Sequence, residues 1–169
     1  VDIATYAQSE RGSLSFGKLV SRAFLSQPHQ ILCGTDNRVI CTNTGRNVIC
    51  TYDFRQPNVF QEAGISEARW DRLTLDEAVG DHLNSVYLRD SILYAIAHGH
   101  TRGSKLATFS YPSMELLSVE NIGTRTGLHN IWVTSDGQRV SCHSESGSLI
   151  DLDVEAPLWQ SGSAMYTRG

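Results

Sequence analysis

The feature that most constrains this chain is an internal repeat. Three segments align, PHQILCGTDNRVICTNTGRNVICTYD (28–53), DHLNSVYLRDSILYAIAHGHTRGSKLATFSYP (81–112) and LHNIWVTSDGQRVSCHSESGSLIDLD (128–153). Each has a histidine at its start, then a short apolar run, a turn with an aspartate, and two further runs separated by a polar loop. The histidines are His29, His82 and His129, so the repeat length is 53 and then 47 residues. Short strands that recur at this period are typical of propeller blades.

The predicted fold is therefore an all-β propeller with about three four-stranded blades, half of a six-bladed ring. Residues 1–28 are assigned to outer strands of a preceding blade, and 29–81 to a first blade with a long crossing loop. Residues 82–128 form a second blade, and 129–169 a third blade with the start of the next. Three blades do not close a ring, and open sheet edges favour aggregation. We expect a second half of the propeller, either a second copy in a dimer or another chain.

The repeat also predicts that polar side chains gather at one end of the blades. The first strand of a blade lies along the central channel and the second runs back antiparallel to it, so the start of one and the end of the other share a face. First strands open with His29, His82 and His129, and second strands end at Asn43, His98 and His143. Five of the six histidines thus occupy these two repeat positions.

Histidines that converge from separate blades suit a divalent transition metal ion such as zinc, iron or copper. Three such ligands with an open position would polarise a carbonyl group or activate a bound water. The alternative is that these histidines bond the backbone or face a substrate without an ion. His98-Gly99-His100 has the spacing of a short chelating pair, but we interpret it as a solvated hairpin loop.

Five further side chains are candidates for ligand binding. Asn43 ends a second strand, and Asn84 and Asn130 follow blade histidines closely, where they could orient a ligand or the backbone. Arg46 and Arg102 lie in loops on the histidine face and could bind a carboxylate or phosphate, although solvated loop arginines are the alternative. The tryptophans are interpreted as packing between sheets; they are Trp70, Trp132 and Trp159.

Composition excludes some partners. The chain has 14 basic and 18 acidic residues, a net charge of −4, and no run of lysine and arginine. We therefore expect no nucleic-acid partner, and the lack of a long apolar stretch predicts no membrane span. The four cysteines show no C-x-x-C spacing and are interpreted as reduced thiols acting as small hydrophobes, which predicts a cytoplasmic location.

Two motifs carry a resemblance to known propellers. They are Pro28-His29-Gln30-Ile31 with Asn43-Thr44-Gly45, and His129-Asn130-Ile131 with Asp136-Gly137. With these motifs, the chain resembles six-bladed propellers of the NHL and virginiamycin B lyase-like type. Segments 82–117 and 127–159 also resemble a group of uncharacterised bacterial propeller proteins of about twice this length.

The resemblance implies a function for the histidine face. Within this broad group, peptidyl-hydroxyglycine lyase holds a zinc ion through histidines from separate blades, which implies His29, His82 and His129 as metal ligands here. The implied protein is a metal-dependent enzyme of lyase or oxidative type that acts on a small polar or peptide-derived substrate. His98, His143 and Arg102 would then handle protons or charge. The alternative is a non-catalytic propeller that binds a ligand or a protein partner through the same face.

Overall fold

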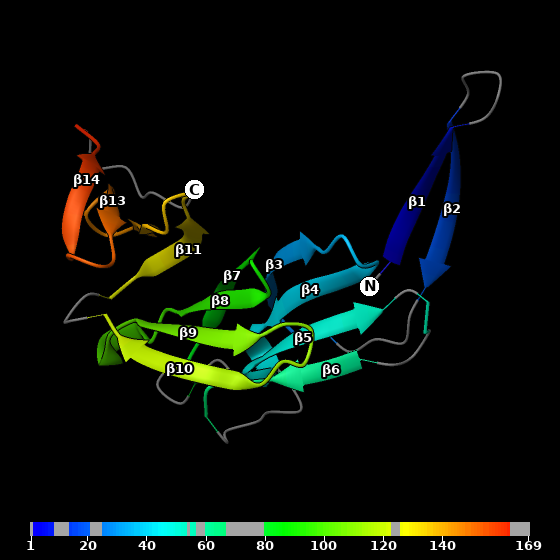
Figure 1. Cartoon of the computed structure of the whole chain (residues 1–169), viewed down its shortest axis with the longest axis horizontal. Coiled ribbons are helices and arrows are strands. Elements are labelled where there is room, and N and C mark those ends of the chain that lie inside the picture. Colours follow the sequence, from blue (N-terminus) through cyan, green and yellow to red (C-terminus); the bar gives the residue numbers. More distant parts are fainter. Residues whose placement is uncertain are drawn as a thin grey trace.

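A computed structural model describes residues 2–8, 14–20, 25–53, 55–56, 60–66, 80–122 and 126–162, the first two ranges by their backbone alone. The prediction of an all-β chain of four-stranded units is confirmed, because the chain forms three four-stranded antiparallel sheets in sequence order (Figure 1). The second sheet lies between the other two, and its innermost strand contacts the innermost strands of both. The structure is a partial propeller.

The strands follow one another along the chain within each sheet. The first sheet comprises β3 (Pro28–Cys33), β4 (Arg38–Asn43), β5 (Val48–Asp53) and β6 (Phe60–Ala63). The second sheet comprises β7 (Leu83–Arg89), β8 (Ile92–Ala97), β9 (Lys105–Ser110) and β10 (Leu116–Asn121). The third sheet comprises β11 (Leu128–Val133), β12 (Arg139–His143), β13 (Ser148–Asp151) and β14 (Ala156–Gln160). Before them, β1 (Asp2–Gln8) pairs with β2 (Leu14–Val20) as a two-stranded sheet.

Tight turns set the register between first and second strands. Asn37 has a φ of 64°, and Asp90 and Ser91 have φ values of 49° and 62°. Asparagine and aspartate tolerate this left-handed region better than most residues, and glycine does so without steric cost, as at Gly137 (φ 94°). Two short 3-10 helices, η1 (Thr44–Arg46) and η2 (His100–Arg102), connect second to third strands.

Apolar side chains alternate between the two faces of each sheet and form separate cores between neighbouring sheets. Between the first and second sheets lie Ile40, Ile49, Leu83, Leu93 and Phe109, which are fully buried. Between the second and third sheets lie Ile96, Leu106, Leu128 and Ile150, also fully buried. Each sheet therefore packs face to face on the next one.

Two interpretations from the sequence need correction. Trp132 and Trp159 do not pack between the sheets of this chain, since they are 38% and 52% exposed, and Trp70 lies outside the described residues. The three blades hold only two mutual interfaces, so one face of the third sheet has no neighbour among the described strands. Cys41, Cys50 and Cys142 are buried as expected, but Cys33 is exposed.

The crossing loop predicted within residues 29–81 is described only in part. Strand β6 lies in this stretch, and residues 67–79 fall outside the described ranges. No helix in the described part of the chain is long and apolar enough to span a membrane. The cytoplasmic location stays a prediction.

Candidate functional site

One end of the sheets brings together histidines from all three repeats. His29 lies in β3, His82 directly precedes β7, and His129 lies in β11. Because β7 contacts both β3 and β11, the three innermost strands start side by side. We call this the histidine end; the opposite end, where the first strands finish, is the far end.

Five imidazole rings form a continuous cluster at the histidine end. The ring centroid of His82 lies 4.8 Å from that of His29, 5.2 Å from His98 and 4.5 Å from His100. The ring of His98 lies 4.8 Å from His100 and 5.1 Å from His129. His29, His82, His98, His100 and His129 are called the histidine cluster below. His82 is its centre.

The backbone around His82 is fixed by buried hydrogen bonds. Asp81 is 6% exposed, and its carboxylate accepts from Asn47 Nδ2 (2.9 Å) and Ser66 Oγ (2.6 Å). The backbone N–H of His98 donates to the carbonyl oxygen of His82 at 2.9 Å. His82 itself adopts a left-handed φ of 55°, which turns the chain as it enters β7. Its ring is therefore placed by both flanking segments.

His82 is a neutral imidazole at physiological pH. Burial disfavours its charged form and, together with the charges that His29, His100, His98 and His129 could carry, lowers the pKa of His82 to about 3. A neutral imidazole offers one nitrogen lone pair and one N–H group. The centre of the cluster can therefore accept a hydrogen bond or ligate a cation without first losing a proton.

The neighbours of His98 and His129 set their tautomers in opposite senses. The backbone N–H of His100 donates to Nδ1 of His98 at 3.1 Å, so the proton of a neutral His98 sits on Nε2. Nδ1 of His129 lies 3.1 Å from the carbonyl oxygen of Gly127 and 2.8 Å from Ser144 Oγ. A carbonyl oxygen only accepts, so a bond to Gly127 puts the proton of His129 on Nδ1 and leaves Nε2 as an acceptor.

The predicted metal can be tested against this geometry. With nitrogen–metal bonds of about 2.0–2.1 Å, the centroids of two imidazoles on one ion are about 4.5–5.2 Å apart. The separations among His82, His98 and His100 lie in that range. The donor type and ring spacing agree, but the ligating atoms do not converge: within the described ranges no group of three or more His, Cys, Asp or Glu side chains is arranged to hold an ion.

Two of the predicted ligand-binding asparagines, Asn43 and Asn84, form buried hydrogen bonds within the fold. Asn43 is fully buried; its Oδ1 accepts from the backbone of Ser26 (2.7 Å), and its Nδ2 contacts Cys50 Sγ (3.3 Å). Asn84 is 4% exposed and donates to the carbonyl oxygen of Leu128 at 2.9 Å, which joins the second sheet to the third. These contacts orient backbone, the second of the two roles expected for Asn84.

The remaining predicted residues are not members of the cluster and have local partners. Arg46 forms an ion pair with Glu62 at 3.0 Å, and Arg102 donates to the carbonyl oxygen of Gly80. Nδ1 of His143 lies 2.5 Å from Ser146 Oγ. The half-buried Asn130 has a left-handed φ of 60°, and its carbonyl oxygen accepts from Ser141 Oγ. Their catalytic and ligand-binding roles stay predictions.

His100 is the cluster member that sequence analysis missed. Gly99 and His100 both adopt left-handed backbone, with φ values of 68° and 48°, and turn the loop back toward His82. A Cβ on Gly99 would clash with the backbone of Gly103, so the turn requires glycine. The short spacing of His98-Gly99-His100 was the available signal.

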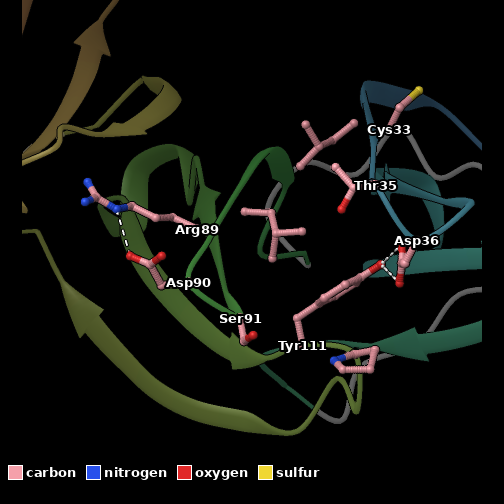
Figure 2. A pocket seen from close by; sticks show the side chains of 11 residues that line it. Cys33, Thr35, Asp36, Arg89, Asp90, Ser91 and Tyr111 are labelled. Atoms are coloured by element: carbon pink, nitrogen blue, oxygen red, sulfur yellow. Dashed lines mark hydrogen bonds and ion pairs between the residues drawn. The ribbon is translucent and has the colours of Figure 1, made fainter.

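The far end carries a pocket of about 480 Å³ that the sequence did not suggest (Figure 2). Turns from the first and second sheets line it, with Leu32 and Leu88 as apolar surface and Cys33, Thr35 and Ser91 as polar groups. Its volume is in the range of small-molecule sites. Tyr111 crosses one side and donates to both oxygens of Asp36 at 2.9 Å.

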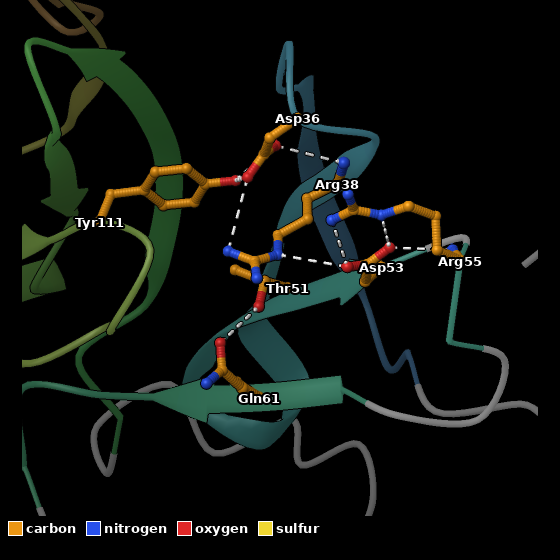
Figure 3. A network of polar contacts seen from close by, with 7 residues as sticks. All are labelled: Asp36, Arg38, Thr51, Asp53, Arg55, Gln61 and Tyr111. Atoms are coloured by element: carbon orange, nitrogen blue, oxygen red, sulfur yellow. Dashed lines mark hydrogen bonds and ion pairs between the residues drawn. The ribbon is translucent and has the colours of Figure 1, made fainter.

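Charged residues continue from this pocket along the first sheet (Figure 3). Arg38 lies 3.5 Å from Asp36 and 3.7 Å from Asp53, and Arg55 pairs with Asp53 at 2.8 Å. The hydrogen bonds from Arg55 are the main reason why the pKa of Asp53 falls to about 2. Each charge of this network thus has a partner within the first sheet or its turns.

The sheet architecture and the histidine cluster define a class: a partial β-propeller with polar side chains gathered at one end of its blades. No protein-family model and no curated protein sequence matches the chain. Among solved structures it is similar to virginiamycin B lyase from Staphylococcus aureus, crystallised as a catalytically inactive variant with quinupristin. The TM-score is 0.54 with 9% identity, over 97% of this chain and 47% of the lyase chain. The similarity shows the propeller fold; the NHL part of the resemblance gains no support from a family model.

Proposed function

We propose that the histidine cluster binds a divalent transition metal ion and is the active site of a propeller enzyme of lyase or oxidative type. The substrate is a small polar or peptide-derived molecule that enters at the histidine end. The observation that carries this proposal is the gathering of five of the six histidines, from three repeats, in one ring-contact cluster.

The chemistry of the cluster supports an ion as its ligand. Imidazole is a common ligand for zinc, copper and iron, and the central His82 is neutral and needs no deprotonation. His82, His98 and His100 have the ring spacing of ligands that share an ion, and His29 and His129 extend the set toward the first and third sheets. A bound ion would act as a Lewis acid toward a substrate oxygen.

The residues of the chain have separate tasks in this proposal. Asp81 and the backbone of His98 hold His82 in place, and Ser144 and Gly127 orient His129. Arg102 is exposed at this end and offers a positive charge to a substrate carboxylate. The similarity to a propeller lyase supports the choice of an enzyme of lyase type.

Elemental analysis of protein purified without chelators tests the proposal. We expect about one transition metal ion per chain, and a loss of at least about tenfold in His82→Ala. His143→Ala is the matched histidine variant and should keep the ion, because His143 ends β12 and is not one of the five histidines of the cluster. Protein without metal that also fails to take up Zn²⁺ in calorimetry would reject the metal site.

A non-catalytic ligand-binding propeller is the second candidate. It is favoured by the finding that the described side chains do not converge as a metal-ligand set. In that case the imidazoles would bond a polar ligand directly, His98 donating through Nε2 and His129 accepting through Nε2. A metal-free protein that binds a polar ligand, with affinity lost in His82→Ala, would select this candidate.

A further inference from the structure

Each sheet uses the same repeat positions to contact the sheet that follows it. In the first sheet these are Leu32, Ile40, Ile49 and Ala63, which belong to the core shared with the second sheet. Register pairs Leu32 with Ile40 and Ile49 with Ala63, so these side chains share one face. We call this the forward face of a sheet, and the opposite face its rear face.

The second sheet repeats the arrangement. Tyr87, Tyr94, Ile96 and Leu106 belong to the core shared with the third sheet, and register pairs Tyr87 with Tyr94 and Ile96 with Leu106. The outer strand contributes Glu120, which pairs with Leu106 and forms an ion pair with Arg139 of the third sheet at 2.9 Å. Two forward faces in this chain are thus fully engaged with the next sheet.

The forward face of the third sheet is apolar as well. When its strands are aligned with those of the first two sheets, the forward-face positions are Trp132, Val140, Cys142, Leu149 and Trp159. Trp132 pairs with Val140 across β11 and β12. Cys142, Leu149 and Trp159 lie opposite one another across β12, β13 and β14. Cys142 is fully buried by its neighbours, but Trp132 is 38% and Trp159 52% exposed. Large aromatic side chains at such positions are typical of surfaces that a partner covers.

We infer that the forward face of the third sheet docks a further four-stranded propeller blade, carried by polypeptide outside this sequence. The partner is an antiparallel sheet whose rear face is apolar. The rear face of the second sheet shows the type, because its buried side chains combine Ala95, Ala97 and Ala107 with the larger Leu93 and Phe109. Trp132 and Trp159 are the two large side chains that this blade would bury.

A second copy of this chain is the less suitable occupant. The rear face of its first sheet would have to dock, but Val48 and Cys50 on that sheet are fully buried and Leu25 packs against them. The β1–β2 sheet ahead of it has two strands and does not match a four-stranded face. The described residues of a second copy therefore offer no free rear face of the required width.

Site-specific photo-crosslinking in the source cells tests this inference. The full protein would carry Trp159→p-benzoylphenylalanine, or the same replacement at Trp132, and crosslinked peptides would be identified by mass spectrometry. The control position is Val154, which is 70% exposed in the turn before β14. We expect adducts at both tryptophan positions, several-fold above the control, with a strand of another propeller sheet absent from residues 1–169.

Each other outcome overturns the inference. Adducts with peptides of residues 1–169 from another molecule, together with a dimer mass in light scattering, would assign the face to a second copy. Equal yields at Trp159, Trp132 and Val154, or no adducts, would show that the face docks no blade. None of these results depends on metal binding at the histidine cluster.

Discussion

The two ends of the blades differ in how deeply their polar side chains are buried and in which elements their hydrogen bonds and ion pairs connect. At the histidine end, Asn43, Asp81 and Asn84 are between 0% and 6% exposed and their hydrogen bonds run between different strands, sheets or connecting segments. At the far end, the charged groups pair mainly within one sheet, and Arg55 is 59% exposed. Burial makes an unsatisfied polar group costly, whereas exposed ion pairs contribute little.

This difference indicates where the structure is specified most strictly. Buried bonds at the histidine end fix the backbone on which the imidazoles are mounted, so a change there should alter both stability and the site. The network at the far end has solvent available to replace a lost partner, so a change there should have smaller effects. Stability measurements can separate the two ends.

The largest effect is expected at the histidine end, for Asp81→Ala. Removing the carboxylate takes away the buried oxygen to which Asn47 and Ser66 donate, at a cost of about 2–4 kcal/mol in unfolding free energy. Urea denaturation measures it, and Asp81→Asn is the conservative control with a smaller loss. If Asp81→Ala lowers the unfolding free energy by less than Tyr111→Phe at the far end does, the two ends do not differ in this way.

At the far end, Tyr111→Phe should cost about 1–2 kcal/mol, because the hydroxyl group donates to the Asp36 carboxylate across two sheets. Tyr94→Phe is the matched control in the second sheet, where the described structure gives the hydroxyl group no hydrogen-bond partner. Equal losses for the two variants would show that the Tyr111–Asp36 bond adds no stability.

The dependence of stability on alkaline pH tests the Tyr111–Asp36 contact at the far end a second time. Burial, followed by the Asp36 carboxylate, raises the pKa of Tyr111 to about 12 from its ordinary value near 10. The folded state therefore holds this proton more tightly, and its contribution is complete below pH 10 and lost as pH rises toward 12. Unfolding free energy of the native protein should fall more steeply over that window than that of Tyr111→Phe. Parallel curves would contradict the raised pKa.

The smallest effect is expected for Arg46→Ala, although Arg46 lies in η1 at the histidine end, because its side chain is 27% exposed. Its ion pair with Glu62 is solvent-accessible, so the loss should be below about 1 kcal/mol. Ligand affinity provides a separate readout: a large loss of affinity with unchanged stability would support the predicted ligand role of Arg46, and unchanged affinity would leave the residue as a partner of Glu62 alone.

The sheets could be predicted from the sequence because the repeat is encoded locally. Histidine, apolar run and turn recur in the same order, and strand alternation with a left-handed turn at Asn37 or Gly137 fixes each hairpin. The exposure of Trp132 and Trp159 could not be predicted in this way, since it depends on whether another sheet covers them.

The site could be predicted only in part. Placement of His29, His82, His98 and His129 follows from strand order, but that of His100 depends on the left-handed turn at Gly99. The burial of Asn43 depends on its bond to the segment before β3. The far-end pocket joins Asp36 to Tyr111, 75 residues apart, and no local pattern encodes that contact.

The central claim is that histidines from three repeats form one site. Long-range nitrogen NMR of the imidazole rings during a Zn²⁺ titration tests it most directly, because each ring reports its own protonation and ligation. The account predicts that His82, His98 and His100 of the second repeat shift at one equivalent together with His29 and His129 of the neighbouring repeats, while His143 does not. Independent shifts at different zinc concentrations, or no shift at all, would contradict it.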